Sequence, residues 1–240
     1  MKPISALLLA CLFLLPSAAS ADAPDEATAA YNAGDLETAA RLFGEAADAS
    51  PHAVAARYNL GNALFRLGRL PEAMQAYRSA QLLSPRDGDI RRNLFLAATA
   101  AGVPLPAPAG LRKAFAVFSA RELHAILRTG YLALVACLLL AYSLPAARRA
   151  FAHLAVPAAL LALFALAGLW LRAADARTPE RILSEETPAR SAPLEDATTL
   201  ATLPAGTFVR VRETRGGWLD VRAGEVVAWV PADRTLAVPR

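Results

Sequence analysis

The residues that could carry catalysis are few and scattered. The three histidines, His52, His124 and His153, occur singly, without the spacing that places two metal ligands on one helix face. Neither a Gly-rich phosphate loop nor a nucleophile elbow is visible, and the Ser and Asp residues form no recognisable constellation with a histidine. The sequence therefore predicts no catalytic residue, no metal site and no cofactor. We expect a protein that acts by binding.

Residues 1–21 have the pattern of a secretory signal peptide. A lysine precedes an apolar run from Ile4 to Leu15, and small residues lead to a predicted cleavage after Ala21. The run is shorter than the roughly 20 residues that a spanning helix needs, and an uncleaved anchor is the alternative. Cleavage leaves Cys137 as the one cysteine, so no intramolecular disulfide can stabilise the exported parts.

Two apolar segments, residues 126–144 and 150–171, are each long enough to cross about 30 Å of hydrocarbon as a helix. The loop 145–149 joins them into a hairpin. Hydrophobic residues make up 55% of the chain, above the roughly 45–50% of soluble domains, which favours a membrane protein. The rest of the chain suits two small soluble modules rather than one enzyme core.

The excess positive charge lies around this hairpin. Residues 111–172 carry seven basic residues and one acidic residue, whereas residues 22–110 and 173–240 are near neutral. Such a distribution favours contact with lipid headgroups and disfavours nucleic-acid binding.

The signal peptide and two crossings together predict that both modules lie outside the cytoplasm. Arg148 and Arg149 in the short loop agree with a cytoplasmic turn. Four basic residues before the first crossing oppose this orientation: Arg112, Lys113, Arg121 and Arg128. The two indications conflict, and we follow the signal peptide because it acts first.

A repeat of 34 residues occupies the first module, residues 22–101. Gly68, Ala73 and Tyr77 have counterparts 34 positions earlier in Gly34, Ala39 and Phe43. This period, with small residues where helices touch, resembles the tetratricopeptide repeat, which implies an all-α array of helix pairs. Residues 54–85 fit best, residues 20–51 form a weaker copy, and Gly88–Ala101 would be a capping helix.

The resemblance implies a groove for an extended or helical segment of another protein, on the face made by the first helix of each pair. For Tyr31 and Phe65, a place in the core is the alternative. The residues that would line the groove are Tyr31, Tyr58, Asn59, Asn62, Phe65, Arg92 and Asn93.

The second soluble module, residues 180–240, has the pattern of a small all-β barrel. Six short β-type runs alternate with Gly-containing turns. The stretches "LPAGTFVRV", "RGGWLDVR" and "AWVPAD" resemble a bacterial SH3-like domain. Some relatives bind peptidoglycan, so Trp218 and Trp229 could form a ligand platform; packing in the barrel core is the alternative that we favour. Residues 102–125 and 172–179 would be linkers, the first Pro-rich and stiff.

The order of these modules resembles the BatE family of the Bacteroides aerotolerance system, with "RYNLGNALFRLGR" and "SPRDGDIRRNL" as the closest local likeness. The resemblance implies a non-enzymatic scaffold of the bacterial inner membrane with both soluble modules in the periplasm. Its partners would be membrane-anchored von Willebrand A-type proteins and a MoxR-type ATPase. The alternative is a cell-envelope module that senses or tethers peptidoglycan through the barrel.

Overall fold

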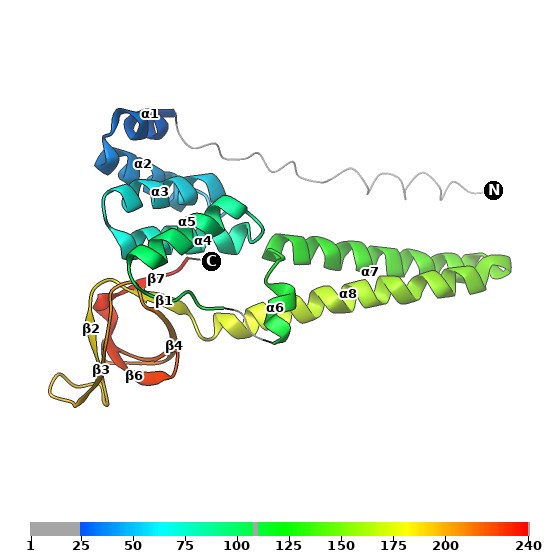
Figure 1. Cartoon of the computed structure of the whole chain (residues 1–240). Coiled ribbons are helices and arrows are strands. Elements are labelled where there is room, and N and C mark those ends of the chain that lie inside the picture. Colours follow the sequence, from blue (N-terminus) through cyan, green and yellow to red (C-terminus); the bar gives the residue numbers. More distant parts are fainter. Residues whose placement is uncertain (1–24, 108–109, 240) are drawn as a thin grey trace.

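The computed structural model describes residues 25–107 and 110–239, and Figure 1 shows its three parts. A stack of short helices lies above a small sheet, and a long helical hairpin projects away from both. The predicted signal peptide, residues 1–21, lies outside the described residues.

Three glycines with positive φ confirm the 34-residue repeat. Gly34, Gly68 and Gly102 have φ angles of 83°, 76° and 69°, and each follows the first helix of a unit. Glycine adopts this conformation without the Cβ clash of other residues, so it ends each helix in the same way. The five helices are α1 (Asp25–Ala33), α2 (Leu36–Ala49), α3 (Val54–Arg66), α4 (Leu70–Leu83) and α5 (Gly88–Ala100).

Small residues allow the paired helices to pack closely. A Cβ on Gly61 of α3 would lie 2.6 Å from the ring of Tyr77 on α4. Tyr77 is buried, and Ala27, which takes the place of Gly61 in the first unit, is also fully buried. Gly61 and Tyr77 therefore form the seam between the two helices of the pair.

The apolar segments form two long antiparallel helices, α7 (Ala120–Ser143) and α8 (Arg148–Ala176), joined by a 3₁₀ turn at Pro145–Ala147. Both are long and apolar enough to cross a membrane. α7 begins six residues before the expected start at Ile126, because Ser119 and Glu122 form a reciprocal capping box at its N-terminus. α8 extends five residues beyond Leu171.

Two glycines bring the helices of the hairpin together. A Cβ on Gly130 would lie 2.9 Å from the backbone nitrogen of Ala162. A Cβ on Gly168 would lie 2.7 Å from Phe115 of the short helix α6 (Leu111–Phe115), so α6 is held against α8. Close backbone approach at small residues is the usual way in which apolar helices associate.

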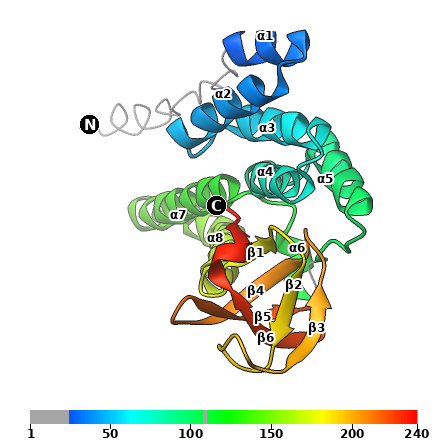
Figure 2. The ribbon, with the colours of Figure 1, turned by 90° about the vertical axis from the view of Figure 1, so that its left-hand side faces the viewer.

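The C-terminal module is one antiparallel sheet of seven strands that curls into a small barrel (Figure 2). The strands follow the order β3-β2-β6-β5-β4-β1-β7. β2 is the strand that the expected runs leave out. The bounds are β1 (Glu180–Leu183), β2 (Thr187–Arg190), β3 (Thr199–Leu203), β4 (Phe208–Arg215), β5 (Trp218–Ala223), β6 (Val226–Pro231) and β7 (Thr235–Ala237).

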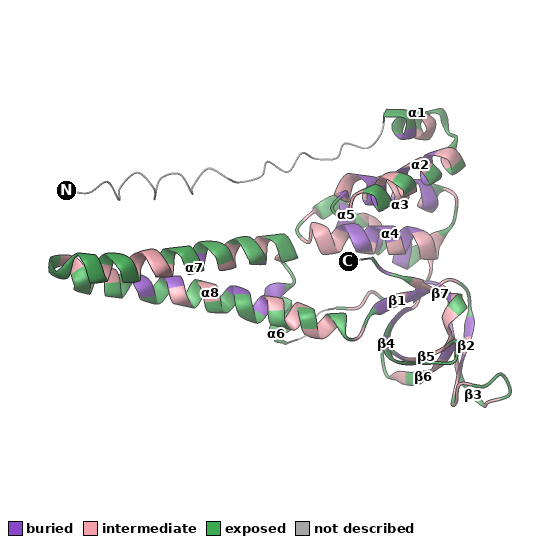
Figure 3. Ribbon diagram, turned by 180° about the vertical axis from the view of Figure 1, so that it is seen from behind, coloured by how far each residue is buried: buried purple, intermediate pink, exposed green. Residues whose placement is uncertain are grey.

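The helical repeats and the barrel share a hydrophobic core. Ile182, Phe208 and Val238 are buried with residues of the helices, including Met74 of α4. In Figure 3, α4, which carries buried residues, lies next to β1 and β7, while most residues of the hairpin are exposed. The helical stack and the barrel therefore pack against each other as one soluble unit, in which the barrel keeps a second core of its own.

The expected Pro-rich linker also packs against this unit. Val103 is buried, and Leu105 packs against the shared core. The turn at Gly206 lies over the same place, since a Cβ there would be 3.3 Å from the sulfur of Met74 and 3.5 Å from Val103. The first part of residues 102–125 is thus a structural element rather than a free spacer.

Candidate functional site

A cavity of about 210 Å³ opens on the face made by the first helices of the repeat units. Its walls come from α1, α3 and α5, with one ring from α4 at the base. The lining residues are Tyr31, Asn62, Phe65, Arg66, Tyr77, Asn93 and Leu96. We name this the groove cavity. Four of the seven predicted groove residues line it: Tyr31, Asn62, Phe65 and Asn93.

A polar network forms the floor of the groove cavity. Asn62 Oδ1 accepts hydrogen bonds from Tyr77 Oη at 2.8 Å and from Asn93 Nδ2 at 2.9 Å. Asn93 Nδ2 also lies 3.1 Å from Tyr58 Oη. Burial and electrostatic repulsion from the nearby Tyr58 hydroxyl when it ionises raise the pKa of the Tyr77 hydroxyl, so it keeps its proton and donates. The network fixes α3, α4 and α5 in one register.

Three of the predicted residues lie outside the cavity lining. Tyr58 is half-buried beneath the floor, with its ring 6.0 Å from that of Tyr77. Asn59 is half-buried on α3. Arg92 is exposed on α5, where its guanidinium lies 3.9 Å from Asp89.

Three further residues of the groove cavity were not predicted to line the groove: Arg66, Leu96 and Tyr77, whose ring lies at the base. The guanidinium of Arg66 lies 4.9 Å from the centre of the Tyr31 ring, a cation–π arrangement between α3 and α1. Leu96 of α5 is 48% exposed, and its neighbour Phe95 is 60% exposed. The cavity therefore combines an accessible cation with an apolar edge.

Arg57 stands where tetratricopeptide repeats frequently have an aromatic residue, and its role could not be predicted from that departure. It is 8% exposed, and its Nε donates to Ser79 Oγ at 2.9 Å. Ser79 Oγ in turn lies 2.9 Å from the carbonyl oxygen of Pro239. Burial lowers the pKa of the Arg57 guanidinium, the usual result of desolvating a cation. Arg57 thus links the repeats to the C-terminal segment.

Trp218 and Trp229 lie on the outer face of the barrel, so the favoured expectation that they pack in its core is wrong. The core consists of the alternate residues, among them Leu219, Val221 and Val230. Trp218 pairs with Pro231 and Asp220 pairs with Trp229 across β5 and β6, which makes the two indoles diagonal neighbours on one face. Both side chains are half-buried.

We name the surface formed by Trp218 and Trp229 the tryptophan platform. Charged residues border it. The guanidinium of Arg215 lies 5.7 Å from the ring centre of Trp229. Asp220, between the indoles, lies 3.5 Å from Arg212. A flat aromatic face with nearby donors and acceptors is suited to an uncharged polar ring such as a sugar.

Within residues 25–107 and 110–239, no group of three or more His, Cys, Asp or Glu residues could hold a metal ion.

Two family models match parts of the chain. Residues 25–89 match a tetratricopeptide repeat model, and residues 186–235 match a bacterial SH3 domain model. No curated protein sequence matches the chain. The matches cover the helical stack up to the start of α5 and strands β2–β6, whereas β1, which joins the barrel to α4, precedes the second match.

These similarities point to binding functions. Tetratricopeptide repeats are protein-interaction modules, and bacterial SH3 domains are associated with peptidoglycan and the cell wall. Both kinds of domain are typically non-catalytic. The chain therefore combines a region of the protein-binding type with a region of the cell-envelope type.

Proposed function

We propose that this protein is a non-enzymatic scaffold of the bacterial inner membrane that binds partner proteins through the groove cavity. The observation that carries the proposal is the groove cavity itself, where Arg66 and the exposed Leu96 border a rigid polar floor. A partner segment that places an apolar side chain against Leu96 and an acceptor beside Arg66 would satisfy both.

The outer surface of the hairpin supports membrane insertion. Large apolar side chains are exposed along both helices, including Leu132 at 61%, Leu160 at 61% and Leu163 at 60%. Such a surface is unfavourable in water and favourable in lipid. Tyr142, in the last turn of α7, and Trp170, near the end of α8, are exposed near opposite ends of the antiparallel hairpin, where aromatic residues meet membrane interfaces.

The arrangement of the two soluble parts supports their location on the same side of the membrane. The helical stack and the barrel lie at the same end of the hairpin (Figure 1) and share a core. A hairpin that crosses twice returns the chain to the side from which it came. With export by the predicted signal peptide, both parts lie in the periplasm, and the turn at 145–149 lies in the cytoplasm.

The BatE-like order of the modules supports the choice of partners. A membrane-anchored von Willebrand A-type protein and a MoxR-type ATPase system are the first candidates, and the von Willebrand A-type protein is the one whose periplasmic part could reach the groove cavity. The role would be assembly of an envelope complex in aerotolerance or envelope stress.

A point substitution tests the groove, because deletion of residues 22–101 would expose the shared core and disrupt the barrel as well. Leu96→Asp should weaken co-purification of the von Willebrand A-type partner with the full-length protein at least tenfold. The matched control is Leu194→Asp, since Leu194 is also exposed, at 58%, but lies in the barrel. Equal capture of the partner by both variants would rule out the groove cavity as its binding site.

Labelling of intact cells tests the orientation. With Cys137 replaced by Ala, single cysteines at Glu45, Ala147 and Glu225 would be treated with an impermeant maleimide. The proposal expects reaction at positions 45 and 225, which are exposed in the two soluble parts, and none at position 147. Reaction at position 147 alone would place the soluble parts in the cytoplasm.

A second candidate function, tethering of peptidoglycan, is favoured by the tryptophan platform. An indole pair on an outer strand face is available to stack on sugar rings, which core tryptophans could not do. In this function the barrel would hold the cell wall while the hairpin holds the membrane.

The full chain in detergent should be used to test wall binding, because the barrel alone would expose Ile182, Phe208 and Val238. Trp229→Ala should reduce sedimentation with purified sacculi at least fivefold, roughly the effect of one lost stacking contact. Trp170→Ala is the matched control, as this exposed tryptophan lies on the hairpin. Retention of the Trp229→Ala variant would exclude the platform as a wall-binding site.

A further inference from the structure

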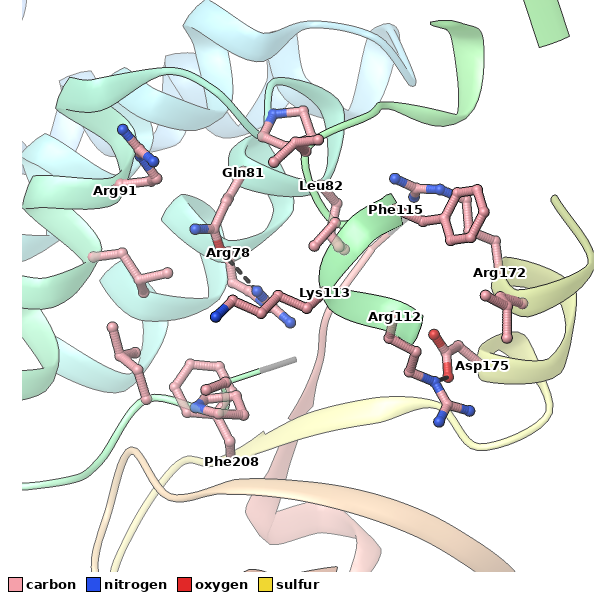
Figure 4. A pocket seen from close by; sticks show the side chains of 18 of the residues that line it. Arg78, Gln81, Leu82, Arg91, Arg112, Lys113, Phe115, Arg172, Asp175 and Phe208 are labelled. Atoms are coloured by element: carbon pink, nitrogen blue, oxygen red, sulfur yellow. Dashed lines mark hydrogen bonds and ion pairs between the residues drawn. The ribbon is translucent and has the colours of Figure 1, made fainter. Parts of the chain in front are cut away.

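A second cavity lies where the helical stack, the barrel and the hairpin meet. It has a volume of about 430 Å³, and its walls come from α4, α5, α6, α8 and β4. Figure 4 shows Arg91 on the helical-stack side, Lys113 on α6 and Arg172 on α8 around this space. We name it the junction cavity.

The lining of the junction cavity is strongly basic. Asp175 is the one acidic residue in the lining. Six cationic side chains line the cavity: Arg78, Arg91, Arg112, Lys113, Arg172 and Arg210. Arg78 is paired with Glu180, and Arg112 lies 2.9 Å from Asp175. Two carboxylates therefore face six cations, and the local surplus is positive.

Two of these cations are available to a ligand. Arg91 and Lys113 are exposed, and the side chain of neither forms a hydrogen bond or ion pair with another described residue. Their structural roles are thus small, so a ligand can engage them without breaking the fold. An anion that accepts from both would have the charge complementarity that Arg and Lys offer to a phosphate.

The opposite part of the cavity is apolar and continuous with the hairpin. Leu171 and Phe115 line the wall beside α8, and Leu82 and Phe208 line the wall beside the soluble unit. Trp170, which directly precedes Leu171, is 68% exposed. In the proposed membrane, this level of α8 lies about 30 Å from Ala150, at the depth of the headgroups.

We propose that the junction cavity binds the anionic headgroup of a membrane phospholipid, with its phosphate beside Arg91 and Lys113 and its first methylenes against Leu171 and Phe115. The proposal rests on the proposed insertion of the hairpin. An acyl chain could follow the exposed apolar surface of α8, which a free phosphate or nucleotide could not use. Basic pockets beside membrane helices commonly bind acidic lipids in this way.

The test uses the full-length protein in neutral detergent micelles, with phosphatidylglycerol, phosphatidylcholine or inorganic phosphate added. Phosphatidylglycerol should raise the melting temperature of the wild-type protein, whereas phosphatidylcholine and inorganic phosphate should not. Arg91→Gln/Lys113→Gln should weaken the phosphatidylglycerol effect roughly tenfold or more in concentration. Arg148→Gln/Arg149→Gln is the matched control, since it removes two exposed cations at the other end of the hairpin.

A second readout does not depend on a variant. Lys113 is the one lysine among the described residues, and its acetylation by an amine-reactive reagent can be followed by peptide mass spectrometry. Phosphatidylglycerol should slow this reaction more than phosphatidylcholine does.

The possible failures are distinguishable. An equal shift with inorganic phosphate would overturn the lipid assignment in favour of a soluble anion. Equal shifts of the melting temperature with both lipids would overturn the assignment of the junction cavity as the lipid site. An equally weakened phosphatidylglycerol effect in the Arg148→Gln/Arg149→Gln variant would overturn it as well. Flotation of the protein with phosphatidylcholine vesicles measures insertion separately. A protein that floats but shows no headgroup preference overturns the lipid site alone, whereas one that does not float overturns both proposals.

Discussion

Arg78 of α4 and Glu180 of β1 form a two-bond ion pair across 102 positions of sequence, with Nε–Oε1 and Nη2–Oε2 distances of 2.7 and 3.0 Å. Glu180 is 9% exposed, so this pair is largely withdrawn from water. It lies beside the shared core and connects the repeats to the first strand of the barrel. The stability of the two soluble parts should therefore be coupled through it.

Loss of either partner should destabilise both parts together. Arg78→Ala or Glu180→Ala should each lower the free energy of unfolding by about 3 kcal/mol, because each leaves a buried charge without its partner. The double variant should lose about 1–3 kcal/mol less than the sum, as measured by urea unfolding of the solubilised protein. The exposed pair Arg41 and Glu45 is the control, with a coupling below about 0.5 kcal/mol. Additive effects at positions 78 and 180 would contradict the coupling.

The seam between α3 and α4 should not tolerate a methyl group. Gly61→Ala places a Cβ 2.6 Å from Tyr77, and the buried ring can move only by disturbing its hydrogen bond to Asn62. We expect a loss of about 1–3 kcal/mol in the free energy of unfolding. Gly44→Ala is the control, since nothing lies within 4 Å of its Cβ and alanine favours the helix. Equal stability of the two variants would show that the seam is loose.

The hairpin should separate when Gly130 is enlarged. Its Cβ would approach backbone atoms of α8, which cannot rotate away as a side chain can. Gly130→Leu should therefore increase the distance between spin labels placed on α7 and α8 and lower the melting temperature in detergent. Ala133→Leu, on the exposed face of α7, should change neither property. An unchanged distance in the Gly130 variant would refute this packing.

The stability of the helical stack should fall in alkaline solution because of Tyr77. Its pKa is raised in the folded state by burial, whereas in the unfolded chain it ionises near pH 10. Above about pH 10 the unfolded state binds fewer protons than the folded state, so the free energy of unfolding falls as pH rises. Below about pH 10 the stabilising contribution of the protonated Tyr77 hydroxyl to the free energy of unfolding is fully present.

Tyr77→Phe should make this dependence shallower. At neutral pH the variant should lose about 1 kcal/mol, because Asn62 no longer accepts from the hydroxyl. Its unfolding free energy should then decrease less than that of the wild type between pH 10 and 11. Tyr142→Phe, at an exposed position, should retain the wild-type curve. A parallel decline of the wild type and the Tyr77 variant would assign the alkaline loss to other groups.

Much of the local structure could be predicted from the sequence because its patterns are short-range. The glycines at 34-residue intervals and the two apolar runs each specify helices through neighbouring residues. β2 was not predicted, since it has four residues and contains Pro188, which lacks an N–H for the ladder. The orientation of Trp218 and Trp229 was misjudged because size alone does not tell which face of a strand is buried.

The candidate sites could be predicted in part. The helical repeat places four of the cavity residues on the same face of the stack, so their proximity could be predicted: Tyr31, Asn62, Phe65 and Asn93. Arg66 was missed because it lies one position past the expected set, at the end of α3. The shared core could not be predicted, because Met74 and Val238 are ordinary apolar residues whose contact depends on the return of the chain from the hairpin.

The contact between α4 and the C-terminal segment imposes an order on synthesis. Ser79 bonds to Pro239, which the ribosome adds 160 positions later, after both long helices have been made. A nascent chain therefore exposes Met74 and Ser79 until β7 arrives, and exposed apolar surface of this kind attracts chaperones and proteases. Products that stop before β7 should be removed, so completion of the barrel would act as a checkpoint on the repeats.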